Sequence, residues 1–340
     1  MTIHDRSTPW LAAALLLLAT AAGAVEPRLD GRQVVGPDEC GECHKHEVAV
    51  WRETKHQKAF YELARKEEAK KIAKAMGIKR LKRDSACIQC HFTMQEGDGA
   101  DKAVAGVSCE SCHGAAREWF EVHNDYGGKE VKKEQESPAH REQRIAAIDR
   151  AGMIRPHQLY DLAENCYQCH LVLNEELVNT GGHKAGSEFE LVAWSQGENR
   201  HNFYRSADGK ENVESAVERR RRLLLVGAAL DLEYSLRGVA GAAAKAKYAV
   251  TMAKRAARGI QRLEAINAKL GNAELAAMIE AAKGAKLKLN NAAELTAAAE
   301  RVKSGARKLA ELKGETLAAL DPLLPKAADY KGVPGEARGE

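Results

Sequence analysis

One five-residue pattern occurs four times in the first half of this 340-residue chain. Each copy has two cysteines three positions apart and a histidine directly after the second cysteine. The pattern is typical of covalent attachment of a c-type haem. Two thiols at this spacing can bond to the two vinyl groups of one porphyrin, and the adjacent imidazole can bind the iron. The attachment cysteines are Cys40, Cys43, Cys87, Cys90, Cys109, Cys112, Cys166 and Cys169, and the histidines that follow are His44, His91, His113 and His170.

Two other uses of paired cysteines fit less well. A tetrahedral zinc site would need two Cys pairs for each ion and gives no reason for a histidine after every second cysteine. A thioredoxin-like redox motif would explain one copy but not four. The four copies use all eight cysteines of the chain, so we expect four covalently bound haem c groups.

The first 24 residues have the features of a secretory signal peptide. Arg6 precedes an apolar run from Leu11 to Ala22, and the small residues Ala22-Gly23-Ala24 form a cleavage site. The apolar run is short for a membrane span, which needs ~20 apolar residues. We therefore expect an exported, periplasmic protein that is cleaved after Ala24 and has no transmembrane segment in the mature chain.

Composition divides the rest of the chain in two. Only 5% of all residues are aromatic, so we expect the haems themselves to form the core of a tetrahaem cytochrome c domain at residues 25–205. Residues 206–340 contain 24 Lys and Arg against 17 Asp and Glu, a net charge of +7 that leaves −3 for the preceding residues. An exported haem protein has no evident access to nucleic acid, so the basic half does not indicate nucleic-acid binding.

The second half predicts a bundle of long helices at residues 206–325, followed by a flexible tail at 326–340. We expect helices at 213–270, 273–287 and 293–312, in a fold that is mainly α. Apolar residues spaced alternately by three and four predict two packing stripes. The stripes are Leu236, Val239, Ala243, Ala246, Val250, Ala253, Ala257, Ile260, and Leu295, Ala299, Val302, Ala306, Leu309. Stripes of this kind serve either an intramolecular bundle, which we favour, or a homo-oligomer.

Seven further histidines are available as second iron ligands. His56 lies in a stretch, Glu47 to Met76, that favours helix. Twelve helical steps from His44 would place His56 about 18 Å away, too far to share one iron, so we expect His56 to bind a neighbouring haem. His46, His140 and His157 are weaker candidates, and Met94 or Met153 would be needed only if histidines were lacking.

Two stretches resemble the tetrahaem cytochrome c-554 family. They are residues 51–59, Trp-Arg-Glu-Thr-Lys-His-Gln-Lys-Ala, and residues 106–114, Gly-Val-Ser-Cys-Glu-Ser-Cys-His-Gly. The resemblance covers roughly Asp38 to Tyr204. That family shares its haem packing with hydroxylamine oxidoreductase and pentahaem nitrite reductase. The C-terminal helices depart from the compact family pattern and are more like those of the larger multihaem enzymes.

The resemblance implies a set of iron ligands. It pairs His44 with His123, His113 with His56, and His170 with His201. It also implies that the haem on His91 is five-coordinate. His183 falls in the region that would border this open face, so His183 either caps the second iron or leaves it open.

Two functions follow from these alternatives. Closed, six-coordinate haems favour an exported electron carrier between redox-protein donors and acceptors, which we expect to act in the nitrogen cycle. An open second haem would favour an enzyme that oxidises or reduces nitric oxide, hydroxylamine or nitrite. The Cys-x-x-Cys-Lys site of pentahaem nitrite reductases is absent from the chain. We therefore favour the electron carrier, in which no residue has a catalytic role.

Overall fold

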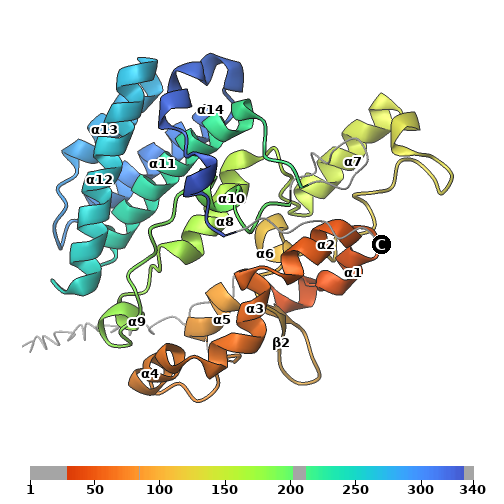
Figure 1. Cartoon of the computed structure of the whole chain (residues 1–340), viewed down its shortest axis with the longest axis horizontal. Coiled ribbons are helices and arrows are strands. Elements are labelled where there is room, and N and C mark those ends of the chain that lie inside the picture. The colour runs from red at the N-terminus through yellow and green to blue at the C-terminus, as the bar shows by residue number, and fades with distance from the viewer. Residues whose placement is uncertain (1–28, 84, 202–211, 333–340) are drawn as a thin grey trace, which may run out of the picture.

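The computed structural model describes residues 29–83, 85–201 and 212–332, and the chain in these ranges is mainly α-helical, as predicted (Figure 1). The predicted leader lies outside the described residues. We call residues 29–201 the motif region, because they carry all four Cys-x-x-Cys-His motifs. Residues 212–332 are the C-terminal bundle, whose helices lie together on one side of the molecule.

The motif region is built from short helices. Its helical elements are η1 (Gly31–Gln33), α1 (Pro37–Gly41), α2 (Lys45–Arg52), α3 (Lys55–Glu62), η2 (Leu63–Arg65), α4 (Glu67–Ala75), α5 (Ser85–His91), α6 (Cys109–His113), η3 (Lys133–Gln135), α7 (Pro138–Arg150), α8 (Leu159–His170), α9 (Glu175–Asn179) and α10 (Leu191–Ser195). Strands β1 (Thr93–Gln95) and β2 (Lys102–Ala105) form an antiparallel hairpin between the second and third motifs.

The predicted helix from Glu47 to Met76 is wrong as a single element, because the chain breaks it twice. Thr54 adopts an extended conformation, and its hydroxyl accepts a hydrogen bond from the backbone N–H of Gln57, which starts α3 with a new N-cap. Lys66 is also extended and begins α4. The axes of the three shorter helices can therefore point in different directions, which a single long helix would not allow.

The bundle contains α11 (Val217–Ala240), α12 (Lys247–Leu270), α13 (Ala273–Gly284), α14 (Ala292–Ala310) and the 3-10 element η4 (Gly314–Leu323). The predicted helix 213–270 is therefore two helices, because α11 ends at its C-cap Gly241 and Ala246 is extended. The break shifts the helical register. Val250, predicted in the packing stripe, is 41% exposed, whereas the stripe from Leu295 to Leu309 is buried as predicted.

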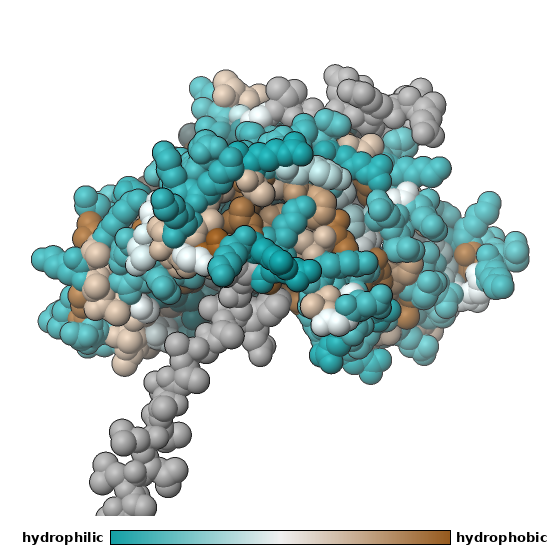
Figure 2. All heavy atoms as spheres, turned by 90° about the horizontal axis from the view of Figure 1, so that it is seen from below, coloured by the Kyte–Doolittle hydropathy of each residue, from teal (hydrophilic) through white to brown (hydrophobic). Residues whose placement is uncertain are grey.

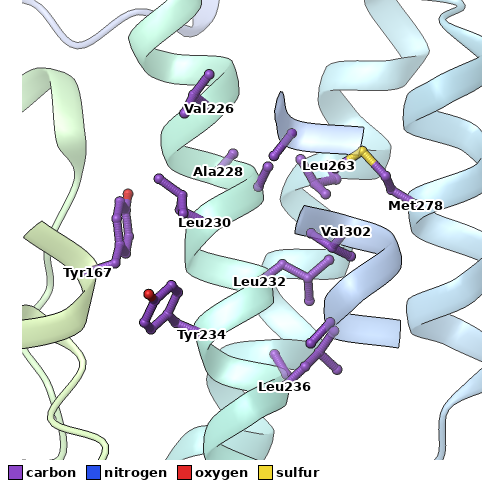
Figure 3. Close-up of a cluster of buried hydrophobic side chains, with 14 of the residues drawn as sticks. Tyr167, Val226, Ala228, Leu230, Leu232, Tyr234, Leu236, Leu263, Met278 and Val302 are labelled. Carbon is purple, nitrogen blue, oxygen red and sulfur yellow. The ribbon is translucent and has the colours of Figure 1, made fainter. Parts of the chain in front are cut away.

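One large hydrophobic core joins the two regions. It runs from Leu159 to Leu320 and includes the buried faces of α8, α11, α12, α13 and α14. Figure 3 shows Tyr167 of α8 directed towards the α11 residues Leu230 and Tyr234. The composition of the chain changes near residue 205, where we predicted a domain boundary. The hydrophobic core continues across this point, because the apolar side chains of α8 pack against those of the bundle helices.

The rest of the motif region has much smaller clusters of its own. One contains Ile88, Phe92 and Met94, and the other contains Ala116, Trp119 and Ile148. Seen from below, the molecule gathers apolar surface near the middle of one face, with hydrophilic side chains around it (Figure 2). The two clusters are small, so the described part of the motif region before α8 contains few apolar side chains that pack against one another.

The start of the predicted flexible tail is ordered. Ala327–Asp329 form the 3-10 element η5, and the backbone of Lys331 is hydrogen-bonded to Ala193 and Glu198. These bonds hold the chain against α10, which the sequence did not indicate. Among the described helices, none combines the length and the apolar character needed to cross a membrane.

Candidate haem-binding site

The four motifs lie as neighbours in a defined order. Helix α1, which carries Cys40, contacts α6 of the third motif, so the first and third motifs touch. Asn165, one residue before the fourth motif, donates a hydrogen bond to the carbonyl of Cys112 at 3.1 Å. The Cys169 thiol lies 3.9 Å from the carbonyl of Gln89 in the second motif. The contacts therefore join the motifs in the order first, third, fourth, second.

A buried carboxylate fixes the contact between the first and third motifs. Glu110 is 1% exposed and accepts hydrogen bonds from the backbone N–H groups of Val35, Gly36 and Ala116 at 3.0, 2.9 and 2.8 Å. Gly36 precedes α1, which carries the first motif, and Glu110 lies inside the third. A buried carboxylate with several N–H donors is well compensated. Glu110 is a positioning residue that the sequence analysis missed.

Close backbone approaches surround the third motif. A Cβ at Gly106 would lie 2.0 Å from the carbonyl oxygen of His56, and a Cβ at Gly114 would lie 2.3 Å from that of Gly152. Both distances exclude a side chain. Glycine at these two positions lets α6 lie directly against α3 and against the chain that follows α7.

His44 and His123 face each other at the spacing of two ligands of one metal. Their ring centroids are 6.3 Å apart and their planes are inclined by 29°. Two imidazoles bound to one metal through bonds of ~2.0 Å hold their centroids about 6 Å apart. Trp119 lies edge-on to His123 at 5.4 Å, which holds the ring. The pairing implied by the resemblance is therefore the one that the geometry fits.

His56 faces His170, with ring centroids 6.2 Å apart and planes inclined by 57°. The ring that His56 faces is thus not the one implied by the resemblance, which paired His56 with His113 and His170 with His201. The backbone carbonyl of His56 accepts a hydrogen bond from Val107, just before the third motif. The backbone of His56 thus approaches the third motif, while its ring lies next to the fourth. The prediction that His56 and His44 do not share an iron agrees with this arrangement.

His113 of the third motif has His201 nearby. Burial lowers the pKa of His113, and the nearby His201 and His44 lower it further. Burial, helped by His201, also lowers the pKa of His56 to about 4. His201 therefore lies near both rings, and His56 already faces His170. Neutral imidazole is the form that binds a metal, and these surroundings favour it at pH 7.

His91 of the second motif has His183 nearby. Burial lowers the pKa of His91 to about 4, and the largest charge effect on it comes from His183. His183 lies on the segment after α9, where its backbone N–H donates to the carbonyl of Leu177 at 3.1 Å. The structure thus brings His183 towards the second motif, and whether it caps the second iron stays a prediction.

The second ring nitrogen of several histidines is held by the protein. Nδ1 lies within hydrogen-bond distance of a backbone carbonyl in His113 (Ile154, 2.9 Å), His183 (Lys184, 2.8 Å), His201 (Asn199, 2.8 Å) and His123 (Phe120). A carbonyl can only accept, so each Nδ1 must carry the proton. This arrangement leaves Nε2 free to bind a metal, which is how ligand histidines are commonly oriented.

The other candidate histidines lie elsewhere. His140 approaches the carboxylate of Glu136 at 2.8 Å, and His157 is exposed beside Arg155. Neither position resembles those of the paired rings. No group of three or more His, Cys, Asp or Glu in the described ranges is arranged to hold a bare metal ion. The donor set, paired imidazoles beside paired thiols, fits haem c.

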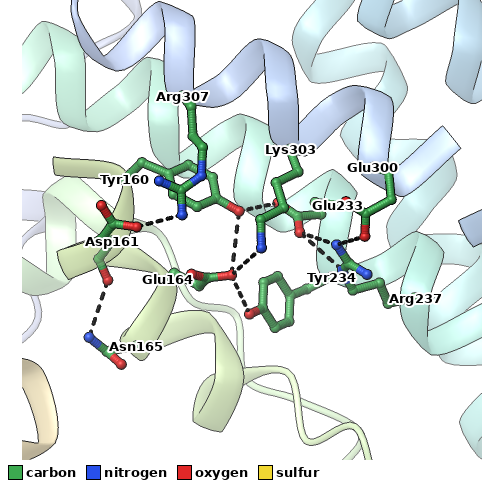
Figure 4. Close-up of polar contacts among 10 residues, drawn as sticks. All are labelled: Tyr160, Asp161, Glu164, Asn165, Glu233, Tyr234, Arg237, Glu300, Lys303 and Arg307. Atoms are coloured by element: carbon green, nitrogen blue, oxygen red, sulfur yellow. Dashed lines mark hydrogen bonds and ion pairs between the residues drawn. The ribbon is translucent and has the colours of Figure 1, made fainter. Parts of the chain in front are cut away.

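A polar network anchors the fourth motif to the bundle (Figure 4). The hydroxyl of Tyr160 on α8 donates to Glu233 of α11 at 2.6 Å, and Tyr234 donates to Glu164 at 3.0 Å. Arg237 pairs with Glu233 and with Glu300 of α14, both at 2.8 Å. Glu233 has no exposed surface, so its charge is balanced inside the protein. The network fixes the helix that presents Cys166 and His170.

Comparison with known proteins agrees with the geometry. The family model for cytochrome c554 and c-prime matches residues 39–114, which include the first three motifs. Cytochrome c-554 of Nitrosomonas europaea is 30% identical over 170 residues, which cover 47% of this chain and 66% of that relative. The chain thus spans just under two thirds of the relative's length. No solved structure matches significantly. In its motifs, its helical fold and this relative, the chain is similar to the cytochrome c-554 family.

Proposed function

We propose that this protein is an exported tetrahaem c-type cytochrome that transfers electrons between redox-protein donors and acceptors. The observation that carries the proposal is the pairing of motif histidines with second histidines at ligand spacing, 6.3 Å for His44 with His123 and 6.2 Å for His56 with His170. Bound haem c supplies a one-electron Fe(III)/Fe(II) couple. Two imidazoles on one iron leave no position for a substrate, so such sites favour electron transfer.

In this proposal each residue has a defined role. The eight cysteines attach four haems, and the four motif histidines are the proximal ligands. The distal ligands are His123 for the first haem, His201 for the third and His56 for the fourth. His183 is the distal ligand of the second. Motif contacts in the order first, third, fourth, second support an uninterrupted series of neighbouring cofactors.

The cellular context rests on the leader and on the resemblance. We place the mature protein in the periplasm after cleavage following Ala24. We also place its partners in the respiration or oxidation of nitrogen compounds. The interior packing of α11 to α14 supports an intramolecular bundle. A sedimentation experiment tests this, because a monomeric mass is expected and a dimeric mass would contradict it.

The alternative function is an enzyme that converts a small nitrogen compound at an open second haem. The nearness of His183 to His91 is the observation that separates the two functions. If His183 binds the second iron, the wild-type ferric spectrum is entirely low-spin and the ferrous protein does not bind carbon monoxide. His183→Ala then creates one high-spin haem that binds carbon monoxide.

His140→Ala is the matched control, because His140 is engaged by Glu136 and lies apart from the paired rings. We expect its spectrum to equal that of the wild type. A wild-type protein that already shows one high-spin haem and binds carbon monoxide as His183→Ala does would overturn the assignment of His183. That result would favour the enzyme.

A further inference from the structure

His170 differs from the other held histidines in the partner of its second nitrogen. Nδ1 of His113 meets a backbone carbonyl, but Nδ1 of His170 meets the hydroxyl of Ser187 at 3.0 Å. A hydroxyl rotates and can donate or accept a hydrogen bond. It therefore fixes the tautomer and orientation of the imidazole only if the serine itself is held in place. The surroundings of Ser187 therefore decide how His170 is oriented and how basic it is.

Ser187 is joined to His170 twice. Its backbone N–H donates to the carbonyl of His170 at 3.0 Å, in addition to the contact between the side chains. Gly186, at φ +85°, makes the turn that allows this return. Phe189 follows and stacks on the His170 ring, with centroids 4.4 Å apart. The segment forms a short loop closed around the proximal histidine.

Arg255 of α12 holds this loop from the bundle side. It is 6% exposed, and its guanidinium donates to the carbonyl of Ser187. It also forms an ion pair with Asp231 of α11, whose side chain is 15% exposed. Bundle helices thus reach the histidine of the fourth motif through one hydrogen-bonded chain: Asp231, Arg255, Ser187 and His170.

The charges in this chain are not equivalent for His170. Arg255, the cation, is bonded directly to Ser187, whereas Asp231 lies one step further from His170. Burial raises the pKa of Asp231, and Arg255 opposes this. A buried ion pair contributes little net stability, because both ions lose their hydration. A charge beside a metal ligand also acts on that ligand.

We propose that Arg255, held by Asp231, is a positioning residue that fixes Ser187 against His170 and raises the reduction potential of the fourth haem. The inference rests on the proposed function, because it requires His170 to bind iron. A nearby cation favours the reduced iron, which has one positive charge fewer. The bundle would then adjust the redox properties of one cofactor in addition to covering it.

The test is an EPR-monitored redox titration of the full-length holoprotein. Arg255→Gln should lower one of the four midpoint potentials, and Asp231→Asn, which leaves Arg255 unopposed, should raise the same one. We expect about a tenfold change in the one-electron reduction equilibrium in each direction, equal to ~59 mV. Arg255→Lys keeps the charge and should recover most of the wild-type potential.

Arg262→Gln is the matched control. Arg262 lies two turns further along α12 and pairs with Glu190 at 3.0 Å, so it is another paired cation of the same helix, although it is less buried than Arg255. It makes no bond to the Ser187 loop, and we expect a smaller shift than for Arg255→Gln. If Arg255→Gln does not fold, it is combined with Asp231→Asn. This double variant removes both charges and tests whether Arg255 fixes the Ser187 loop against His170. Its EPR signal for the fourth haem should change, as in Ser187→Ala.

Two results would overturn the inference. One is four unchanged potentials in Arg255→Gln, and the other is equal shifts in Arg255→Gln and Arg262→Gln. An unchanged signal in the double variant counts against it in the same way. Failure of the proposed function is distinguishable, because a haem count below four in the wild-type protein would contradict that function before any variant is compared.

Discussion

Leu225, Leu232 and Leu236 in the C-terminal bundle have no exposed surface and belong to one core that continues into α8. Among the described residues before α8, the motif region has two small clusters, around Phe92 and Trp119. The C-terminal bundle buries apolar side chains against one another, whereas the motif region contains thiols and imidazoles positioned for large apolar cofactors. We therefore expect the bundle together with α8 to support itself, and the motif region before α8 to depend on haem for its stability.

Loss of haem gives the largest expected effect. A full-length chain with all eight cysteines replaced by alanine should lose the folded structure of residues 29–153, because their apolar surface then has no partner. Helices α11 to α14 should stay folded. Hydrogen exchange measured by mass spectrometry checks this, with the holoprotein as control. Slow exchange throughout residues 29–153 of the haem-free chain would contradict the comparison.

A cavity in the bundle tests whether the bundle is stabilised by its own hydrophobic core. Leu232→Ala removes a side chain that packs against Gly259 of α12 and should cost about 2–5 kcal/mol of the free energy of unfolding. The haem absorption spectrum should stay unchanged. Denaturant unfolding followed by circular dichroism measures the loss. Val250→Ala, at a position 41% exposed, is the control and should cost much less.

The two regions meet at the network in Figure 4, and Glu233→Gln probes that contact. Removing the charge of Glu233 weakens its bonds with Tyr160 and Arg237 and should cost about 1–3 kcal/mol. Glu300→Gln is the control, because its side chain is 57% exposed and an exposed pair contributes about 1 kcal/mol or less. Equal losses in denaturant unfolding of the two variants would show that the network does not join the regions.

The sequence predicted the attachment sites and the mainly helical fold, because both depend on local patterns. The stripe from Leu295 to Leu309 is buried as expected. The stripe through Val250 failed because a break near Gly241 restarted the helical register. A single glycine that ends a helix resembles one that only bends it, so the pattern could not distinguish the two.

Acid sensitivity gives the smallest expected effect and belongs to the motif region. Ion pairing with Arg144, with help from His140, lowers the pKa of Glu136 from 4.5 to about 2. A carboxyl whose pKa is lower in the folded state contributes stability that is complete above pH 4.5 and is lost as the pH falls towards 2. Arg144 also donates to the carbonyl of His123 at 2.9 Å, so the pair supports a ligand segment.

Glu136→Gln should therefore flatten the acid dependence of unfolding in this pH range. Thermal unfolding measured from pH 5 to about pH 3 compares the variant with the wild type. Glu53→Gln, which removes an exposed pair with Lys58, is the control. A wild-type slope that persists unchanged in Glu136→Gln would assign the acid sensitivity to other carboxyl groups.

The ligand pairs show the limit of sequence reasoning at the site. His56 lies in a family-like stretch, yet its ring faces His170 and only its backbone approaches the third motif. Which side of a helix faces which motif is decided by tertiary packing over more than 100 residues. Ser187 and Arg255 lie outside any motif, and Glu110 occupies a variable position of one, so only their contacts in the folded chain identify them.

The most direct test of the account is peptide mass spectrometry of the purified full-length protein. We predict one covalently attached haem on each of the four peptides that contain Cys40, Cys87, Cys109 and Cys166, and none elsewhere. A motif peptide that carries zinc, a disulfide or free thiols in place of haem would contradict the account.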